Sequence, residues 1–374
     1  LRWSDGTTGV RPVDPAAVAT GVDTERLRST VRLAVTYLDR VIDINYYPSE
    51  QAAASNPRWR PIGLGSMGLQ DVLFALRLPF DSPEAKELST RIAEEVQLSA
   101  LERSTELAEE LGAHPAFAET RAARGQLQHD VYGVTPTQTE RWAAVRERIA
   151  AHGLRNSLMV AIAPTATIAS IAGCYECIEP QVSNLFKRET LSGEFLQVNT
   201  ALVRELRSLG LWNDAVREKL KTDNGSVAGI ADLPEETRRL FRTAWELPQK
   251  ALIDMAAARQ AYVDQSQSLN LFMESPNIGK LSSMYLYAWK AGLKTTYYLR
   301  SRPATRIQQA TVAGARAGAS WGAATGAPGA SQPTAPGAPG VVGGLTASEP
   351  VRTFTDAEAL ACSLENPEAC EACE

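Results

Sequence analysis

The chain has 374 residues, 44% of them hydrophobic, so it can bury a sizeable core in one large domain or two moderate ones. Its net charge of −5, without Lys/Arg runs interleaved with aromatic residues, argues against a nucleic-acid-binding surface. No apolar stretch approaches the about 20 residues of a membrane-spanning helix, so we expect a soluble, cytoplasmic protein. Because the first residue is leucine, we expect the natural protein to begin further upstream.

Helices are expected where apolar residues recur at helical spacing after a capping residue or a proline. This pattern predicts helices over residues 23–42, 82–111, 135–153, 195–209, 234–263 and 280–291, with a bend at Pro248 in the fifth. The third helix has capping-box spacing at Thr135 to Gln138. Residues 45–59 contain prolines and polar side chains, which predicts a loop.

Short continuous apolar runs predict strands that are covered on both faces, as in a parallel sheet. Such a run covers residues 158–163, and we also expect strands at residues 61–65, 266–272 and 294–299. The last two flank the helix at 280–291 and together form a βαβ unit, which predicts an α/β fold with outer helices. The Gly63-Leu64-Gly65 sequence is weak evidence for a nucleotide, and close packing of backbones is the more common reason for it.

A turn of small and hydroxylated residues follows the strand at 158–163. It consists of Pro164, Thr165, Ala166, Thr167 and Ile168. Uncovered backbone N–H groups at the start of a helix suit a phosphate, and the alternative is an ordinary helix N-cap. The residues alone leave both interpretations open.

The five cysteines do not form the even, dispersed set of a secreted disulfide framework. Two Cys-x-x-Cys pairs are present, Cys174 with Cys177 and Cys370 with Cys373, and their separation disfavours a shared zinc ion. We expect Cys174 and Cys177 to be buried packing residues. The terminal pair has the spacing of a reducible dithiol, with an unreactive tail as the alternative for it and for Cys362.

The adjacent tyrosines, the histidines and an Ala/Gly/Pro-rich segment each allow a prediction. Tyr297 and Tyr298 are adjacent in a predicted strand, and such neighbours ordinarily point to opposite faces, one into the core and one to solvent. The three histidines have no metal-ligand spacing, so we assign them no catalytic role. Residues 311–346 are mostly Ala, Gly, Pro and Ser, which predicts disorder.

Several blocks of this sequence resemble the large subunit of class I ribonucleotide reductases. They are RPIGLGSMGLQDVL at 60–73, GLRNSLMVAIAPTAT at 153–167, LSGEF at 191–195, DQSQSLN at 264–270, LKTTYYLRSRPA at 293–304 and the tail ENPEACEACE. The resemblance implies the C-terminal half of a ten-stranded α/β barrel with outer helices. It divides the chain into a helical lead-in (1–59), the half-barrel (60–304), a flexible Ala/Gly/Pro-rich linker (305–361) and a redox-active tail (362–374).

The resemblance also implies roles for individual residues. Pro164 to Ile168 would bind the substrate diphosphate, although Ile168 stands where many relatives carry a hydroxyl. Tyr297 and Tyr298 would relay a radical, because a phenol can lose an electron and a proton together. Cys370 and Cys373 would carry electrons from thioredoxin or glutaredoxin to the active site.

The implied activity is radical reduction of ribonucleoside diphosphates to deoxyribonucleoside diphosphates for DNA synthesis. Implied partners are a metal-containing small subunit that supplies the radical and a second large subunit. No cofactor would bind this chain, and the ATP and dNTP effector sites precede this region in relatives. The thiyl-radical cysteine also precedes it, so we expect the chain to be inactive alone. The alternatives are a non-catalytic remnant, a split-gene half that only binds a partner, and an adenosylcobalamin-dependent relative, which would not need Tyr297 and Tyr298.

Overall fold

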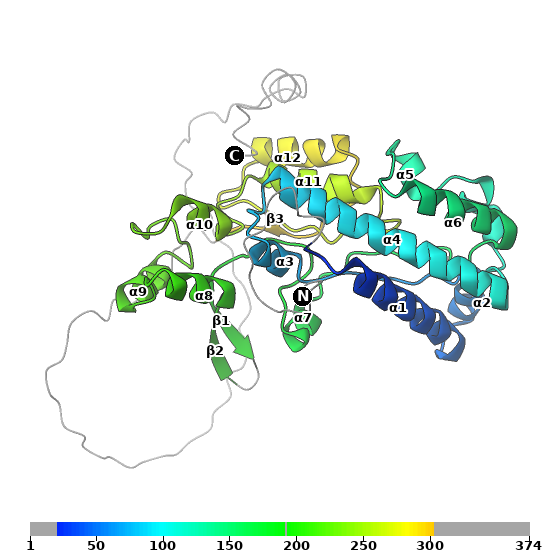
Figure 1. Ribbon diagram of the computed structural model, residues 1–374, viewed down its shortest axis with the longest axis horizontal. Coiled ribbons are helices and arrows are strands. Elements are labelled where there is room, and N and C mark those ends of the chain that lie inside the picture. Colours follow the sequence, from blue (N-terminus) through cyan, green and yellow to red (C-terminus); the bar gives the residue numbers. More distant parts are fainter. Residues whose placement is uncertain (1–20, 191–192, 303–374) are drawn as a thin grey trace, which may run out of the picture.

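The computed structural model describes residues 21–190 and 193–302 (Figure 1). Extended segments lie side by side at its centre, and every pairing between them is parallel. Leu64 pairs with Val160, Ile162 pairs with Gln267, and strand β3 (Leu271–Phe272) pairs with strand β4 (Leu299–Arg300). The expected parallel α/β arrangement is confirmed, with the segments in chain order across the sheet. The predicted linker and the tail with Cys362, Cys370 and Cys373 lie outside the described residues.

The paired stretches are shorter than the predicted strands because side chains replace some backbone partners. The Asp264 carboxylate accepts hydrogen bonds from the N–H groups of Met159 and Val160, both at 2.8 Å. On the next strand, Asn270 Oδ1 accepts from the N–H of Tyr298 at 3.1 Å. Each such bond satisfies a buried donor without extending the ladder.

Long helices cover the central segments on the outside. Helix α4 (Pro83–Leu111) packs against α1 (Thr24–Ile44), α6 (Thr139–His152) and α11 (Gln249–Gln260) (Figure 1). Helix α12 (Ile278–Lys290) connects β3 to β4, which confirms the predicted βαβ unit. The remaining short helices of this body are α2 (Glu50–Trp59), α3 (Leu69–Ala75), η2 (Phe117–Glu119), η3 (Ala122–Arg124), α5 (Gln128–Val131) and α7 (Ala166–Ala172).

A smaller unit lies at one end of the molecule (Figure 1). It comprises the antiparallel hairpin β1 (Leu185–Thr190) and β2 (Gly193–Val198) and the helices α8 (Thr200–Ser208), α9 (Asp214–Thr222) and α10 (Glu235–Leu240). This unit has its own apolar cluster, into which Phe74 of α3 inserts. An ion pair between Arg77 and Glu205 at 2.8 Å ties the unit to the main body.

Four predictions of local structure were wrong. The expected loop at 45–59 contains α2, because the Ser49 side chain accepts from Ala52 N and caps a helix that tolerates Pro57 in its last turn. Residues 193–198 pair with β1 instead of starting a helix. The expected bent helix at 234–263 is two helices, since Pro248 is the N-cap of α11. Helix α6 begins only at Thr139, and its N-cap residue Gln138 makes no side-chain capping bond.

The Gly-x-Gly sequence serves close packing. A Cβ atom added at Gly65 would lie 2.8 Å from the carbonyl oxygen of Ala161 on the neighbouring segment. Backbone and side chain cannot approach that closely, so this position requires glycine. The packing interpretation of the motif is confirmed.

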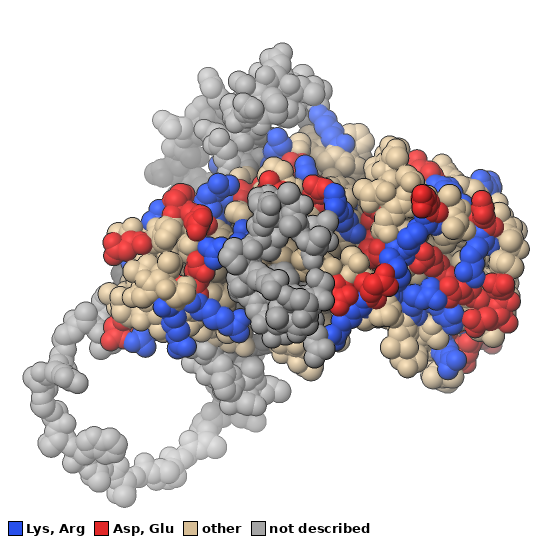
Figure 2. All heavy atoms as spheres, viewed as in Figure 1, with Lys and Arg blue, Asp and Glu red and all other residues tan. Residues whose placement is uncertain are grey.

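Charges of both signs are interspersed over the α1, α4 and α6 side of the visible face (Figure 2). Arg28 and Arg141 pair with Glu95, and Arg32 pairs with Glu106. Such mixed surfaces bind water and neighbouring charges, and they lack the one-sided basic stripe of a nucleic-acid-binding face. None of the helices in the described ranges is long and apolar enough to span a membrane.

Candidate functional site

The turn after the second central segment has an unusual backbone. Thr165 has φ 54°, in the left-handed region where a β-branched residue is an outlier, and α7 begins directly after it. Cys177, also left-handed with φ 47°, donates from its backbone N–H to Thr165 Oγ1 at 2.8 Å. The bond between these two positions holds the turn in a conformation that costs about 1 kcal/mol or more per residue.

The turn presents donors to solvent. Ala166, Thr167 and Ile168 are exposed, and their N–H groups lie in the first turn of α7, where no intrahelical acceptor is available. Pro164 is exposed too and Thr165 is half-buried. The expected opening of the strand into a helix is therefore correct, and the five predicted residues lie together at its start.

Cys174 and Cys177 lie just beyond this turn and are not activated thiols. Burial raises the pKa of the Cys177 thiol to about 12, and its Sγ lies 3.7 Å from the carbonyl oxygen of Ser268. Burial, and secondarily the charge of Asp71, raises the pKa of the half-buried Cys174. Both groups are therefore protonated at neutral pH, in line with the packing role that was expected.

Tyr297 and Tyr298 form a pair of tilted rings in contact on the surface. Their ring centroids are 4.0 Å apart, and Tyr297 Oη donates to Tyr298 Oη at 3.0 Å. The side chains are 45% and 54% exposed, so neither ring lies in the core, unlike the alternating arrangement of an ordinary strand. The pair precedes β4, where the backbone is not a regular strand and both rings can lie on one side. The bond to Tyr298 is the main cause that raises the pKa of Tyr297.

A buried carboxylate holds the backbone next to this pair. Glu179, 7% exposed, accepts hydrogen bonds from the backbone N–H and the side-chain Nδ2 of Asn270, both at 2.9 Å. Asn270 Oδ1 in turn accepts from the N–H of Tyr298. Sequence reasoning gave neither residue this role, because Asn270 lies in the DQSQSLN block without a function of its own and Glu179 lies outside the quoted blocks. The only signal was a polar residue inside an apolar strand.

The register of the sheet relates the turn to the tyrosines. Ile162 pairs with Gln267, and Leu271 pairs with Leu299. Extending these pairings by a few residues brings Thr165, Asn270 and Tyr298 to the same level on three neighbouring segments. With about 4.8 Å between adjacent strands, the turn and the tyrosine pair are separated by about 10 Å across the sheet.

The opposite end of the segments has a different character. Asp264 is half-buried beneath the first residues of the 158–163 segment, and desolvation raises its pKa to about 6. Lys294 Nζ donates to the carbonyl oxygens of Val263, Asp264 and Gln265, the shortest distance being 2.7 Å to Asp264. These groups bind backbone and fix the strand ends. Within the described ranges no cluster of His, Cys, Asp and Glu could hold a metal ion.

Comparison with known proteins now decides the family. The model of the family "Ribonucleotide reductase, barrel domain" matches residues 13–299. The chain belongs to the ribonucleotide reductase barrel family. It is similar to the ribonucleoside-diphosphate reductase large subunit of Arabidopsis thaliana, with 42% identity over 94% of this chain and 41% of the plant protein. The large subunit of Caenorhabditis elegans is 46% identical over 78% of this chain and 37% of the nematode protein.

A solved structure agrees with these relatives. The Actinobacillus ureae class Id ribonucleotide reductase alpha subunit superimposes with a TM-score of 0.60 at 25% identity, covering 76% of this chain and 48% of that chain. The chain spans well under half the length of the curated relatives above. The predicted family is therefore confirmed, together with the barrel-domain fold class.

Proposed function

We propose that this chain supplies the diphosphate-binding turn and the radical-relay tyrosines of a large subunit that reduces ribonucleoside diphosphates to deoxyribonucleoside diphosphates. The observation that carries the proposal is the register of the parallel segments, whose extension by three residues from Ile162 places Thr165 level with Asn270, in a chain of this family. Substrate and relay would then lie on one edge of the barrel. The thiyl-radical cysteine and the nucleotide effector sites would come from the remaining length of the subunit.

The diphosphate role is supported by the chemistry of the turn. Residues 157–175 contain no Lys or Arg, so recognition would rest on the N–H groups of Ala166 to Ile168 and the hydroxyl of Thr167. These groups are exposed and already oriented by the bond between Thr165 and Cys177. The main-chain contacts do not depend on the side chain at Ile168.

A charge placed in this turn tests the binding mode. Ile168→Asp should raise the Kd for ADP or CDP about 10-fold or more, because the new carboxylate would repel the diphosphate at close range. An acidic residue in the first turn of a helix is itself favourable, so folding should persist. Binding is measured by isothermal titration.

Ile171→Asp is the matched control. Ile171 is 81% exposed and lies on the same helix, about 4.5 Å further along its axis. This variant carries the same charge and should bind nearly as the unmodified chain does. Equal affinity of both variants would remove the diphosphate role of the turn.

The relay role is supported by the tyrosine geometry. The 3.0 Å bond between the two phenol oxygens offers a direct path for an electron and a proton. Both rings reach the surface, where a metal-containing small subunit could deliver a radical. The bond to Tyr298 raises the pKa of Tyr297 above its ordinary value of about 10, so this phenol is neutral at rest, and no cofactor on this chain is required.

The proposed large-subunit function also implies the remaining partners. Cys370 and Cys373 would accept electrons from thioredoxin or glutaredoxin and reduce the active-site disulfide, with the segment between Arg302 and Cys370 providing the reach. A second large subunit would complete the assembly.

A chimera tests the whole proposal. The segment of the Arabidopsis thaliana large subunit that aligns with this chain is replaced by this chain, and dCDP formation is measured with the plant small subunit and thioredoxin. We expect turnover, because the two segments are 42% identical. A chimera that binds CDP but forms no dCDP would contradict the proposal and favour a non-catalytic role.

A further inference from the structure

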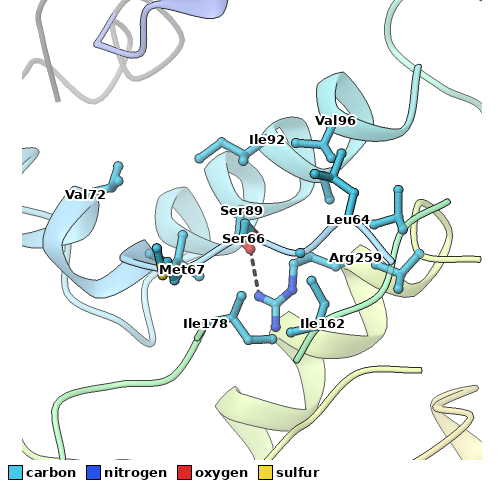
Figure 3. Close-up of a pocket in the computed structure, with 15 residues that line it drawn as sticks. Leu64, Ser66, Met67, Val72, Ser89, Ile92, Val96, Ile162, Ile178 and Arg259 are labelled. Carbon is cyan, nitrogen blue, oxygen red and sulfur yellow. Dashed lines mark hydrogen bonds between the residues drawn. The ribbon is translucent and has the colours of Figure 1, made fainter. Parts of the chain in front are cut away.

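A cavity of about 80 Å³ lies between α4, α11 and the first central segments (Figure 3). Its walls are mainly apolar and include Leu64, Ile92, Ile162 and Ile178. None of the residues from Pro164 to Ile168 lines it, so it is separate from the diphosphate turn. The polar groups at its wall are the side chains of Ser66, Ser89 and Arg259.

Arg259 brings a positive charge into this apolar space. The residue is 3% exposed, and its guanidinium reaches into the middle of the lining residues (Figure 3). Nη1 donates to Ser89 Oγ at 2.7 Å, and Nε donates to Gln267 Oε1 at 3.4 Å. Nη2 has no hydrogen-bond partner among the described residues.

No negative charge balances this guanidinium within the part of the chain that is described. None of the ion pairs there includes Arg259, and no residue lining the cavity is acidic. Burial lowers the pKa of Arg259 to about 10, which still leaves the group protonated at neutral pH. An unpaired buried charge is strongly unfavourable, so the site calls for a counter-ion.

We propose that this cavity binds one monovalent inorganic anion of the halide type, chloride in solution, against Nη2 of Arg259. The Ser89 hydroxyl accepts from Nη1, so its own proton is free to donate to the anion, and the Ser66 hydroxyl is a further donor at the wall. The volume of the cavity is larger than the about 30 Å³ that one water molecule occupies in the liquid. Most oxygens of a sulfate or phosphate would face apolar walls and find no hydrogen-bond donor. The cavity therefore favours a halide, which is more weakly hydrated, over these oxyanions.

Diffraction with bromide tests the site directly. Crystals of the full chain are grown with sodium bromide as the only halide, and anomalous data are collected at the bromine edge. The proposal expects an anomalous peak in contact with Arg259 Nη2. A cavity that holds only water, or a carboxylate from another part of the chain, would overturn it.

Thermal unfolding provides the solution test. Tm is measured while bromide replaces gluconate at constant ionic strength, and it should rise by about 5 to 10 °C when bromide reaches about 100 times its Kd. Arg259→Met should abolish this rise, whereas Arg121→Met, which removes an exposed arginine, should keep it. If Arg259→Met does not fold, Ser89→Ala serves instead and should shift the bromide midpoint to higher concentration. An equal rise in the cavity variants and the Arg121 control would overturn the proposal.

Discussion

Tyr298→Phe is expected to abolish dCDP formation by the chimeric enzyme while leaving nucleotide binding unchanged. Phenylalanine retains the ring whose centroid lies 4.0 Å from that of Tyr297, so the local packing should persist. It lacks the phenol proton and the oxygen that accepts from Tyr297 Oη. A radical therefore cannot cross this position. Turnover is measured as dCDP formed per chimera, and binding as the Kd for CDP.

Tyr37→Phe is the control for this experiment. Tyr37 lies on α1 and is 58% exposed, so the variant also removes an exposed phenol oxygen, but from a different element than the one that carries Tyr297 and Tyr298. It should retain full turnover. Substantial dCDP formation by the Tyr298→Phe variant of an active chimera would exclude a radical relay through this residue. The diphosphate role of the turn would be untouched by that result.

The sequence predicted those helices whose signals are local. Helix α1 begins after Asp23, which accepts from Arg26 N, and α4 begins after Ser82, which accepts from Ala85 N. Each capping residue lies within three residues of the N–H group that it binds, so the local sequence pattern is enough to predict it. Strand β2 was missed because its partner is β1, and an amphipathic run that pairs in a hairpin can also satisfy a helical spacing.

In the candidate site, too, features with a local sequence signal could be predicted and features set by distant contacts could not. The turn from Pro164 to Ile168 could be predicted because small and hydroxylated residues follow a buried strand. The orientation of the tyrosines could not, since it depends on Asn270, which binds the Tyr298 backbone from a neighbouring segment. The role of Glu179 was equally hidden, because its partner is 91 residues further along the chain. Contacts of this kind are set by the tertiary fold and leave no local pattern.

Helix α6 offers the largest stability effect that the fold predicts. Its N-cap residue Gln138 makes no side-chain capping bond, and the acceptor comes from Glu94 on α4 instead. The Glu94 carboxylate accepts from Thr137 N at 2.8 Å, Gln138 N at 3.0 Å and Trp142 Nε1 at 3.0 Å. It also accepts from Thr137 Oγ1 at 2.7 Å. Glu94 thus fixes the two residues that precede α6 and the indole of Trp142 near its start, more than forty residues away along the chain.

Glu94→Ala should lower the free energy of unfolding by about 3 to 5 kcal/mol, because the buried indole N–H of Trp142 and the part-buried donors of Thr137 and Gln138 lose their acceptor at once. Glu94 is 1% exposed, so water cannot replace the carboxylate without opening the packing of α4 against α6. Urea unfolding followed by circular dichroism measures the change as a lower midpoint at an unchanged slope. Glu94→Gln keeps one acceptor oxygen and should lose about half as much.

Glu87→Ala is the matched control on the same helix. The Glu87 side chain is 60% exposed and pairs with Arg91 one turn away, so its removal should change stability by at most about 0.5 kcal/mol. A similar loss in Glu87→Ala and Glu94→Ala would mean that the helix propensity of α4, and not the cap of α6, sets the effect. A loss confined to Glu94 would show that the start of α6 is held by α4, which explains why the capping-box pattern in its own sequence misplaced it.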